Sequence, residues 1–296
     1  MGSQAHSHPD RPCHSLFAAL LSAAVLLLLS PPLEAASGRP RYIRTADQKT
    51  LPDGEAVADL AEARIIIFGE THGSRSHHEV QIALLRDLKK HGAEVVVGME
   101  VFAASANPEL ERWSEGKMDS ADIFLRFGDT WTFDWWPVYR DLLFFIQRER
   151  IPLFGINADE DLVRLVARAG LDGLDESTRS GLPDVSCSSD GRYLELLGLV
   201  MNGVPAGDGR FARFCEAQML RDAVMAREAQ GALKRWPGRI VVLLTGNFHA
   251  WRPGIASHLP VEEDLPLRII LPGGDVPFPD TETLGREADY IWIMEQ

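Results

Sequence analysis

The sequence lacks an excess of basic residues, a long internal repeat and any low-complexity segment. Its 30 Lys and Arg stand against 43 Asp and Glu, which gives a net charge of −13. Binding to nucleic-acid phosphates or to anionic membranes needs a basic face, so we expect no nucleic-acid partner. With 45% hydrophobic and 25% charged residues over 296 positions, the composition is that of a globular chain long enough to bury a full core.

Cysteine is also scarce, and the cysteine that a lipoprotein signal needs just after its apolar run is missing, because Cys13 lies before the run Leu16–Leu29. This run is too short to span a bilayer comfortably, and small residues follow it. The pattern predicts a secretory signal peptide over residues 1–37, with a retained membrane anchor as the alternative. We expect a soluble exported protein, periplasmic or otherwise in the envelope, with a single α/β domain over residues 38–296.

Only two cysteines remain after such a cleavage, Cys187 and Cys215. In an oxidising compartment two remaining cysteines often pair, so we predict a disulfide between them. The alternative is two unpaired cysteines, one of them packed on a helix.

Short apolar runs, several of them rich in β-branched residues, predict the strands of a mostly parallel sheet. They are Arg64–Gly69, Val95–Met99, Pro152–Ile156, Ile240–Thr245, Leu267–Leu271 and Tyr290–Met294. Between the first two runs, Ser76–Glu79 has the form of a capping box before a helical pattern that Gly92 ends, which predicts a βαβ unit.

Further helix starts and one long helix complete the expected fold class, an α/β protein with a mostly parallel central sheet, flanking helices and helical insertions. The starts are at Asn107, at Pro137 and at Asp159 or Asp161, and the long helix covers about 210–236. The Gly-, Ser-, Asp- and Pro-rich stretch Leu171–Asp190 is expected to be a loop, either a lid or a surface excursion.

Polar residues that can bind ligands follow the apolar strands directly. Glu70 and His72 follow the first, Glu100 the second, Asn157 the third and His249 the fourth. Because the carboxyl ends of parallel strands lie at one edge of a sheet, we expect these side chains to meet in one crevice. Glu100 ends a strand that should be buried on both faces, so its carboxylate needs a cation or a network of donors.

Four other residues are candidates for the same crevice. His77 and His78 lie in the first helical turn after the loop that carries His72, and either point into the crevice or are exposed. Gln218 and Asp222 are four residues apart on the long helix, hence on one face, which either lines the crevice or is solvated.

Aromatic residues are dense in the segment Trp131–Trp136, which includes Trp135, and at Tyr139. They either pack in the core or form an apolar wall beside the polar crevice, as a flat hydrophobic ligand requires.

Taken in order, these motifs resemble the ChaN family of haem-binding proteins, over residues 64 to about 260. The matching features are Gly69–His72, His77, His78 and Gln81, Gly98–Glu100, the Trp-rich segment up to Tyr139, Asn157, the helix that carries Glu216, Gln218 and Asp222, and Gly246–His249. The family belongs with the Tiki metalloproteases and the erythromycin-esterase-like proteins to one superfamily, which shares the doubled Gly-x-x-His motif.

The resemblance implies haem traffic and iron uptake in a Gram-negative envelope, with cofacial haems between two subunits and a tyrosine as iron ligand. A homodimer and an outer-membrane haem uptake system are then the expected partners. Of the four tyrosines, Tyr139 lies in the matched segment and is the predicted axial ligand. The predicted haem-binding residues are Tyr139, His77, His78, Trp135, Asn157, Gln218 and Asp222. Many relatives are lipoproteins, and this sequence departs from them in its signal.

A hydrolase is the alternative function. His72, His249 and a carboxylate from Glu70 or Glu100 are the ligand types of a catalytic zinc or manganese ion with an open position for water. The same residues also suit metal-free acid–base chemistry, with either histidine as general base. A binding or scaffolding module without a cofactor would leave Glu100 unexplained. The family resemblance favours haem.

Overall fold

A computed structural model describes residues 40–52, 54–187, 191–201, 204, 208–260, 265–274 and 285–294. The predicted signal peptide and its cleavage site lie outside these residues. None of the helices in the described ranges combines the length and the apolar character that a membrane span requires.

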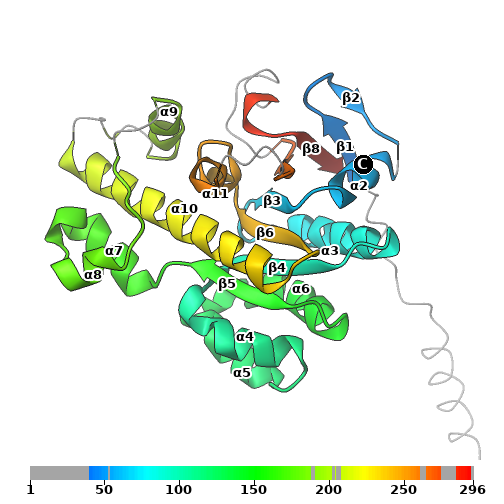
Figure 1. Ribbon diagram of the computed structural model, residues 1–296, viewed down its shortest axis with the longest axis horizontal. Coiled ribbons are helices and arrows are strands. Elements are labelled where there is room, and N and C mark those ends of the chain that lie inside the picture. Colours follow the sequence, from blue (N-terminus) through cyan, green and yellow to red (C-terminus); the bar gives the residue numbers. More distant parts are fainter. Residues whose placement is uncertain are drawn as a thin grey trace, which may run out of the picture. The chain divides into compact units, whose positions relative to one another are not determined.

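Eight strands in the described residues form one sheet in the order β2-β1-β8-β7-β3-β6-β4-β5 (Figure 1). Their bounds are β1 Pro40–Arg44, β2 Lys49–Thr50, β3 Ile65–Glu70, β4 Val95–Ala103, β5 Leu153–Asn157, β6 Ile240–Gly246, β7 Leu267–Pro272 and β8 Tyr290–Met294. Every pair from β8 to β5 is parallel, and β1 is antiparallel to both β2 and β8. The predicted fold class is confirmed, and the strands β1 and β2 are additional to the prediction.

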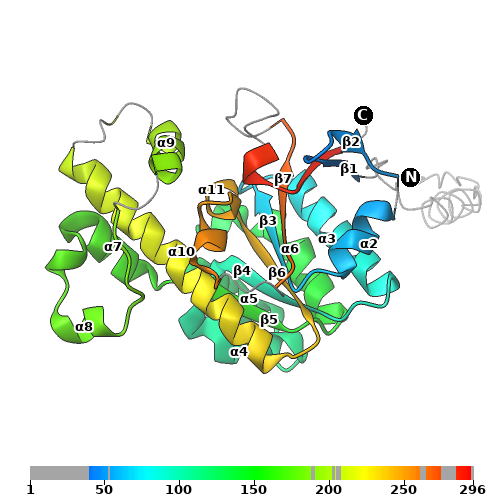
Figure 2. The same ribbon diagram turned by 45° about the horizontal axis from the view of Figure 1, so that its top comes forward.

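The central strands are buried on both faces, which explains their continuous runs of Ile, Val and Leu. Successive side chains of a strand point to opposite faces. In β3, Ile66 and Phe68 therefore join a core with the helices α3 and α6, whereas Ile65 and Ile67 join a second core with α10. Figure 2 shows α10 running diagonally past β4, β5 and β6, with α3 and α6 on the other side of the sheet.

The α-helices connect these strands and cover the sheet. Their bounds are α2 Glu55–Ala61, α3 Arg75–Lys90, α4 Asn107–Ser114, α5 Ser120–Gly128, α6 Trp136–Arg148, α7 Glu160–Ala169, α8 Glu176–Ser180, α9 Gly191–Val200, α10 Gly209–Arg235 and α11 Asn247–Ala250. Short 3₁₀ helices lie at η1 Ala104–Ala106, η2 Phe133–Trp135, η3 Leu171–Gly173 and η4 Ile255–His258.

Two local predictions are wrong. Ser76 does not cap α3, because the helix already begins at Arg75 and the N-cap residue is Ser74, whose side chain makes no capping hydrogen bond. The stretch predicted as one long loop contains η3 and α8 in its described part, and α9 follows at Gly191, a helix that the sequence interpretation missed.

The predicted disulfide is confirmed: Cys187 is bonded to Cys215, with 5.5 Å between the two Cα atoms. The bond attaches the segment that precedes α9 to the first half of α10. Cys215 is fully buried in the core that α7, α9 and α10 share.

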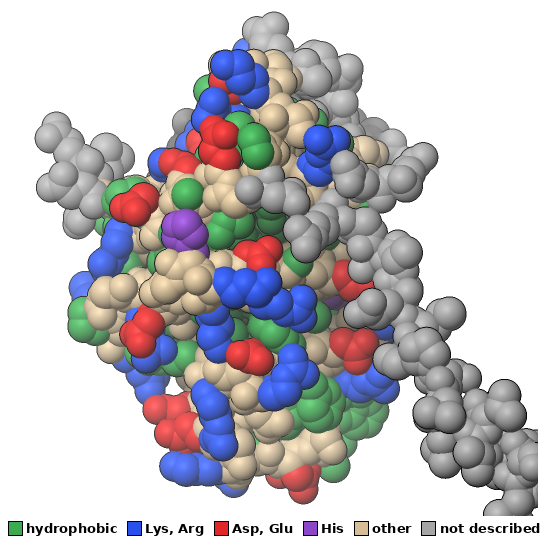
Figure 3. All heavy atoms as spheres, turned by 90° about the vertical axis from the view of Figure 1, so that its right-hand side faces the viewer, with side chains coloured by type: hydrophobic (Ala, Val, Ile, Leu, Met, Phe, Trp, Pro, Cys, Tyr) green, Lys and Arg blue, Asp and Glu red, His purple; other side chains and the backbone are tan. Residues whose placement is uncertain are grey.

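Charged side chains on the surface pair across neighbouring elements. On the face drawn in Figure 3, Lys and Arg are interspersed with Asp and Glu. Arg268 of β7 donates hydrogen bonds of 2.7 and 2.8 Å to Asp59 of α2, and Arg126 of α5 pairs with Glu109 of α4 at 2.8 Å. Such partly exposed pairs contribute up to about 1 kcal/mol each, so the three buried cores carry most of the stability.

Candidate functional site

A cavity of about 380 Å³ opens at the carboxyl ends of β3, β4 and β6. It is lined by Glu70, Thr71, His72, Glu100, Trp131, Val200, Phe214, Gln218, Arg221, Gly246, Asn247, Phe248 and His249. The parallel register sets Glu70 of β3 beside Gly246 of β6, and β4 pairs with β6 on its other side. The predicted convergence of Glu70, His72, Glu100 and His249 in one pocket is therefore confirmed.

In the first half of the site, hydrogen bonds connect the side chains of Tyr139, Glu70 and His72 in that order. The Tyr139 hydroxyl donates a hydrogen bond to Glu70 Oε1, and His72 Nδ1 lies 3.0 Å from the same oxygen. Gln81 donates to Glu70 Oε2 at 2.7 Å. Burial alone would raise the pKa of Glu70, but the neighbouring His78, His72 and Tyr139 outweigh it and lower this pKa to about 2. Glu70 is thus a carboxylate, and His72 donates Nδ1–H to it.

The second half repeats this arrangement with different elements. Asp222 of α10 is fully buried, and its Oδ1 lies 2.7 Å from His249 Nδ1. The Tyr193 hydroxyl of α9 donates to Asp222 Oδ2 at 2.9 Å. Each histidine therefore has a carboxylate on Nδ1 and presents Nε2 to the cavity, and each carboxylate also accepts from a buried tyrosine.

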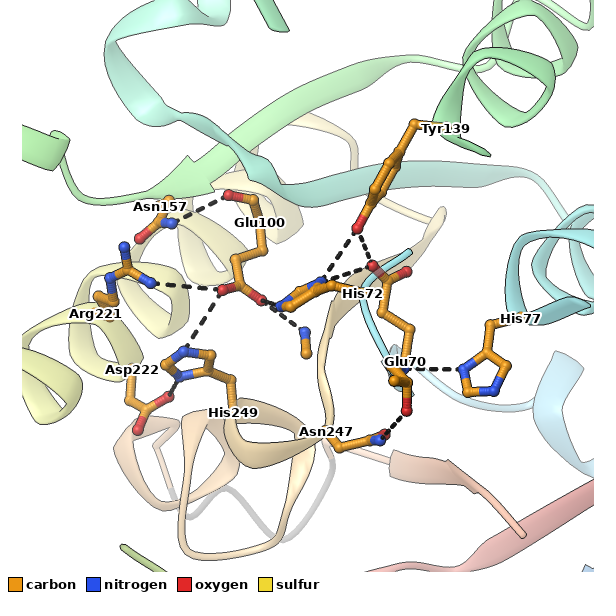
Figure 4. Close-up of polar contacts among 12 residues, drawn as sticks. Glu70, His72, His77, Glu100, Tyr139, Asn157, Arg221, Asp222, Asn247 and His249 are labelled. Carbon is orange, nitrogen blue, oxygen red and sulfur yellow. Dashed lines mark hydrogen bonds and ion pairs between the residues drawn. The ribbon is translucent and has the colours of Figure 1, made fainter. Parts of the chain in front are cut away.

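Glu100 lies between the two imidazoles (Figure 4). Its Oε1 is 3.5 Å from His249 Nε2, and its Oε2 is 3.9 Å from His72 Nε2. Gly246 N–H donates to Oε2 at 2.6 Å, and Arg221 Nη1 is 3.7 Å from Oε1. This network of cations and donors is the partner that the buried carboxylate was predicted to need.

The charges of this network reinforce one another. Burial raises the pKa of Glu100, but His249, His72, Arg221 and the Gly246 N–H together outweigh burial and lower it. Burial lowers the pKa of His72, but the hydrogen bond that His72 donates to Glu70 and the charges of Glu100 and Glu70 outweigh burial and raise this pKa. The floor of the cavity therefore combines an ionised Glu100 with a His72 that holds its proton to a higher pH than usual.

The predicted haem contacts divide into residues that line the cavity and residues that support it. Gln218 lines the cavity, whereas Asp222 contacts Nδ1 of His249 on the side away from the cavity. Trp131 also lines it and packs on His72 with ring centroids 4.5 Å apart, whereas Trp135 packs on His72 at 5.7 Å without reaching the lining. Asn157 lies beneath the floor, where its Nδ2 donates to the Glu100 carbonyl oxygen at 3.1 Å.

His77 and His78 are buried, and neither lines the cavity, so they are neither exposed nor placed to contact a ligand there. Thr71 N–H donates to His77 Nδ1 at 2.9 Å, which fixes the loop before α3. His78 Nδ1 lies 2.9 Å from Gln81 Oε1 and so orients the amide that donates to Glu70.

Tyr139 does not fit the predicted role of iron ligand in this arrangement. Its side chain is fully buried, its hydroxyl is committed to Glu70, and burial followed by the Glu70 charge raises its pKa well above the ordinary value. Tyr42, Tyr193 and Tyr290, the remaining tyrosines, are also buried and absent from the lining. No tyrosine oxygen reaches the lining of the cavity.

The predicted metal ligands contact one another: His72 lies against Glu70 and Glu100, and His249 lies against Glu100. Across the described ranges, no three His, Cys, Asp or Glu side chains are placed to hold a metal ion.

Sequence reasoning missed two kinds of site residue. The apolar side chains Val200 and Phe214 give no signal in a sequence, because nothing distinguishes them from core residues, and Phe248 was noted only as part of the motif Gly246–His249. Tyr193 lies on the helix that was not predicted.

Comparisons with known proteins agree with the fold and the motifs. A family model described as "Haem-binding uptake, Tiki superfamily, ChaN" matches residues 56–259. The solved structure "Cofacial heme binding to ChaN of Campylobacter jejuni" has a TM-score of 0.67 at 17% identity, covering 87% of this chain and 97% of that one. An erythromycin esterase, EreC, has a TM-score of 0.48 at 16% identity, covering 86% of this chain and 82% of that one.

A curated plant protein is similar to part of the chain. RETICULATA-RELATED 5, chloroplastic, of Arabidopsis thaliana is 23% identical over 256 residues, covering 79% of this chain and 34% of that protein, so the chain spans about a third of this relative's length. The family match extends over more than half of the 296 residues and confirms the family that the motifs indicated. The chain belongs to the ChaN family of the Tiki superfamily, the family described as haem-binding uptake.

Proposed function

We propose that the cavity is the active site of a hydrolase that cleaves an ester or amide bond in a small molecule by acid–base catalysis. One observation carries the proposal: two imidazoles, each with a buried carboxylate on Nδ1, present their Nε2 atoms to an ionised glutamate at the floor of a cavity. A carboxylate on Nδ1 fixes the tautomer and strengthens the histidine as a base, as in hydrolytic triads.

We assign the two histidines different roles in the reaction. His72, whose pKa is raised, donates its Nε2 proton to the leaving group. His249 takes a proton from the attacking water at Nε2, while Asp222 stabilises the imidazolium that forms. The Glu100 carboxylate stabilises both protonated imidazoles, and the proton gained by His249 returns through solvent as His72 is reprotonated.

Arg221 is placed to stabilise negative charge on the substrate. It lines the cavity, its Nη1 lies 3.7 Å from Glu100 Oε1, and its buried Nε has no hydrogen-bond partner among the described residues. A donor directed at the oxygen that becomes negative in the transition state is worth roughly 2.7–4 kcal/mol in comparable sites. Trp131, Val200, Phe214 and Phe248 favour a substrate with an apolar group near the scissile bond.

The test is hydrolysis of p-nitrophenyl acetate, butyrate and octanoate and of p-nitrobutyranilide by the chain dialysed against EDTA. We expect turnover of at least one probe above the uncatalysed rate, with preference for an apolar acyl group. No turnover of any probe contradicts the hydrolytic function. Turnover that EDTA removes and Zn²⁺ or Mn²⁺ restores contradicts the metal-free route and supports metal-dependent hydrolysis.

A second candidate function is haem binding at the mouth of the cavity, within haem or iron handling in a bacterial envelope. It is favoured by family membership and by the apolar mouth, where Val200 is 48% exposed. Trp131, Phe214 and Phe248 would contact the porphyrin, and Arg221 and Gln218 would bind its propionates. The signal-like N-terminus and the Cys187–Cys215 bond support export, since disulfides persist in oxidising compartments. A homodimer and an outer-membrane uptake partner belong to this proposal.

If haem binds at the mouth, Trp131→Ala should weaken haemin binding about tenfold, because an aromatic wall is lost. Tyr139→Phe should leave it unchanged, because the Tyr139 hydroxyl does not reach the cavity. Haemin titrations followed in the visible spectrum measure both, with Trp113→Phe, a conservative change in the core, as the control. Loss of haemin binding in Tyr139→Phe would support Tyr139 as the iron ligand and contradict haem binding at the mouth of the cavity.

A further inference from the structure

Tyr193 is connected to the cavity without lining it. It lies on α9 with 2% of its surface exposed, and its hydroxyl donates to Asp222 Oδ2 at 2.9 Å. The other oxygen of Asp222 lies 2.7 Å from His249 Nδ1. The ring of Tyr193 also packs edge-on against Phe248, with centroids 5.3 Å apart, and Phe248 immediately precedes His249.

A carboxylate that accepts at only one oxygen is free to turn about its terminal torsion, which is broad and roughly two-fold. The Tyr193 hydroxyl bonds the second oxygen of Asp222 and so fixes the plane of the carboxylate. In that plane Oδ1 faces His249 Nδ1, which holds the imidazole as the Nδ1–H tautomer. Nε2 then faces the cavity, 3.5 Å from Glu100 Oε1.

The opposite half of the site has the same order of hydrogen bonds, from a tyrosine to a carboxylate to a histidine. Tyr139 donates to Glu70, which accepts Nδ1–H from His72. These two series of hydrogen-bonded side chains come from different secondary-structure elements. Each series ends with an imidazole whose Nε2 faces Glu100. A buried tyrosine behind each carboxylate is thus a repeated feature of the site.

We propose that Tyr193 is a positioning residue of this active site, which orients His249 through Asp222 and so makes α9 part of the catalytic apparatus. The inference rests on the proposed hydrolytic function for its kinetic consequence. It does not rest on that function for its structural consequence, the tautomer of His249.

The test compares Tyr193→Phe with Tyr290→Phe. Tyr290 is a matched control, since it too is 2% exposed and donates to an aspartate, Asp59, at 2.7 Å, while neither residue lines the cavity. Each substitution removes one hydroxyl that donates to an aspartate, which is fully buried at Asp222 and partly exposed at Asp59. Both should therefore lower Tm, Tyr193→Phe by about 2–4 °C and Tyr290→Phe by less. Only Tyr193→Phe should lower kcat, about tenfold, with KM for the best probe ester unchanged.

The ¹⁵N spectrum of the His249 ring provides a readout that needs no substrate, with His249→Gln for assignment. We expect the neutral ring to be the Nδ1–H tautomer in the unaltered chain and in Tyr290→Phe, and a mixture of tautomers in Tyr193→Phe. An unchanged His249 signal in Tyr193→Phe, or an equal loss of kcat in both variants, overturns the inference. If the unaltered chain hydrolyses no probe, the hydrolytic function fails and the ring spectrum alone decides the role of Tyr193.

Discussion

Replacing Glu100 by glutamine is expected to lower kcat/KM for the best probe ester by about 10³-fold, close to 4 kcal/mol of transition-state stabilisation. The substitution removes the one negative charge that faces both imidazoles among the described residues. Without it, the His72 proton is less stabilised, and the imidazolium that forms at His249 loses its nearest counter-charge on the cavity side. A smaller fraction of His72 then carries the proton that the leaving group needs, and proton uptake by His249 becomes harder.

The same substitution should leave the fold intact. Glutamine keeps the size of the side chain and an oxygen that can accept from Gly246 N–H, which donates to Glu100 at 2.6 Å. Steady-state kinetics and thermal unfolding measure the two effects separately. Asp59→Asn is the control, since Asp59 accepts hydrogen bonds from Arg268 and Tyr290 outside the cavity. This control should lose stability and keep its kcat/KM. An unchanged kcat/KM in Glu100→Gln would show that the Glu100 charge has no role in the mechanism.

The sheet was predictable because its signals are local. Runs such as Ile65–Phe68 and Ile240–Leu244 are apolar at every position, as strands buried on both faces must be. From the parallel arrangement it follows that Glu70, Glu100 and His249 meet, although they are far apart in sequence. The strands β1 and β2 carry no such signal, because they are the last two strands on one side of the sheet and are partly exposed.

The hydrogen-bond partners within the site were not predictable, because they depend on which side of a helix faces inward and on contacts between distant helices. Tyr139 follows the Trp-rich segment, so the sequence allowed it to face a ligand, whereas α6 turns its hydroxyl towards Glu70 inside the protein. Asp222 was recognised only as a possible lining residue. Its role as the partner of His249 depends on how α10 packs against α11, which is a tertiary contact between residues 27 positions apart.

A methyl group added at Gly246 is expected to lower kcat/KM by about 10²-fold, because this glycine makes room for His72. A Cβ at this position would lie 2.6 Å from His72 Nε2 and 3.0 Å from its Cε1, closer than non-bonded atoms approach. The imidazole cannot simply yield, since Glu70 holds its Nδ1 and Trp131 packs on its ring at 4.5 Å. A displacement of the order of 1 Å at a catalytic group lowers the reaction rate by about 10²-fold.

The backbone itself does not require glycine at this position, which makes Gly246→Ala a clean steric test. Gly246 has φ −58° and ψ 148°, an extended conformation that alanine adopts without strain, so the cost arises from the contact with His72. Overpacking of this kind typically lowers stability by about 1–3 kcal/mol, and urea unfolding should detect it. Gly231→Ala is the control, because a Cβ there meets nothing within 4 Å, so activity should be kept and α10 stabilised by about 0.5–1 kcal/mol. Full activity in Gly246→Ala, with the predicted loss of stability, would mean that the position of His72 matters for packing and not for the reaction.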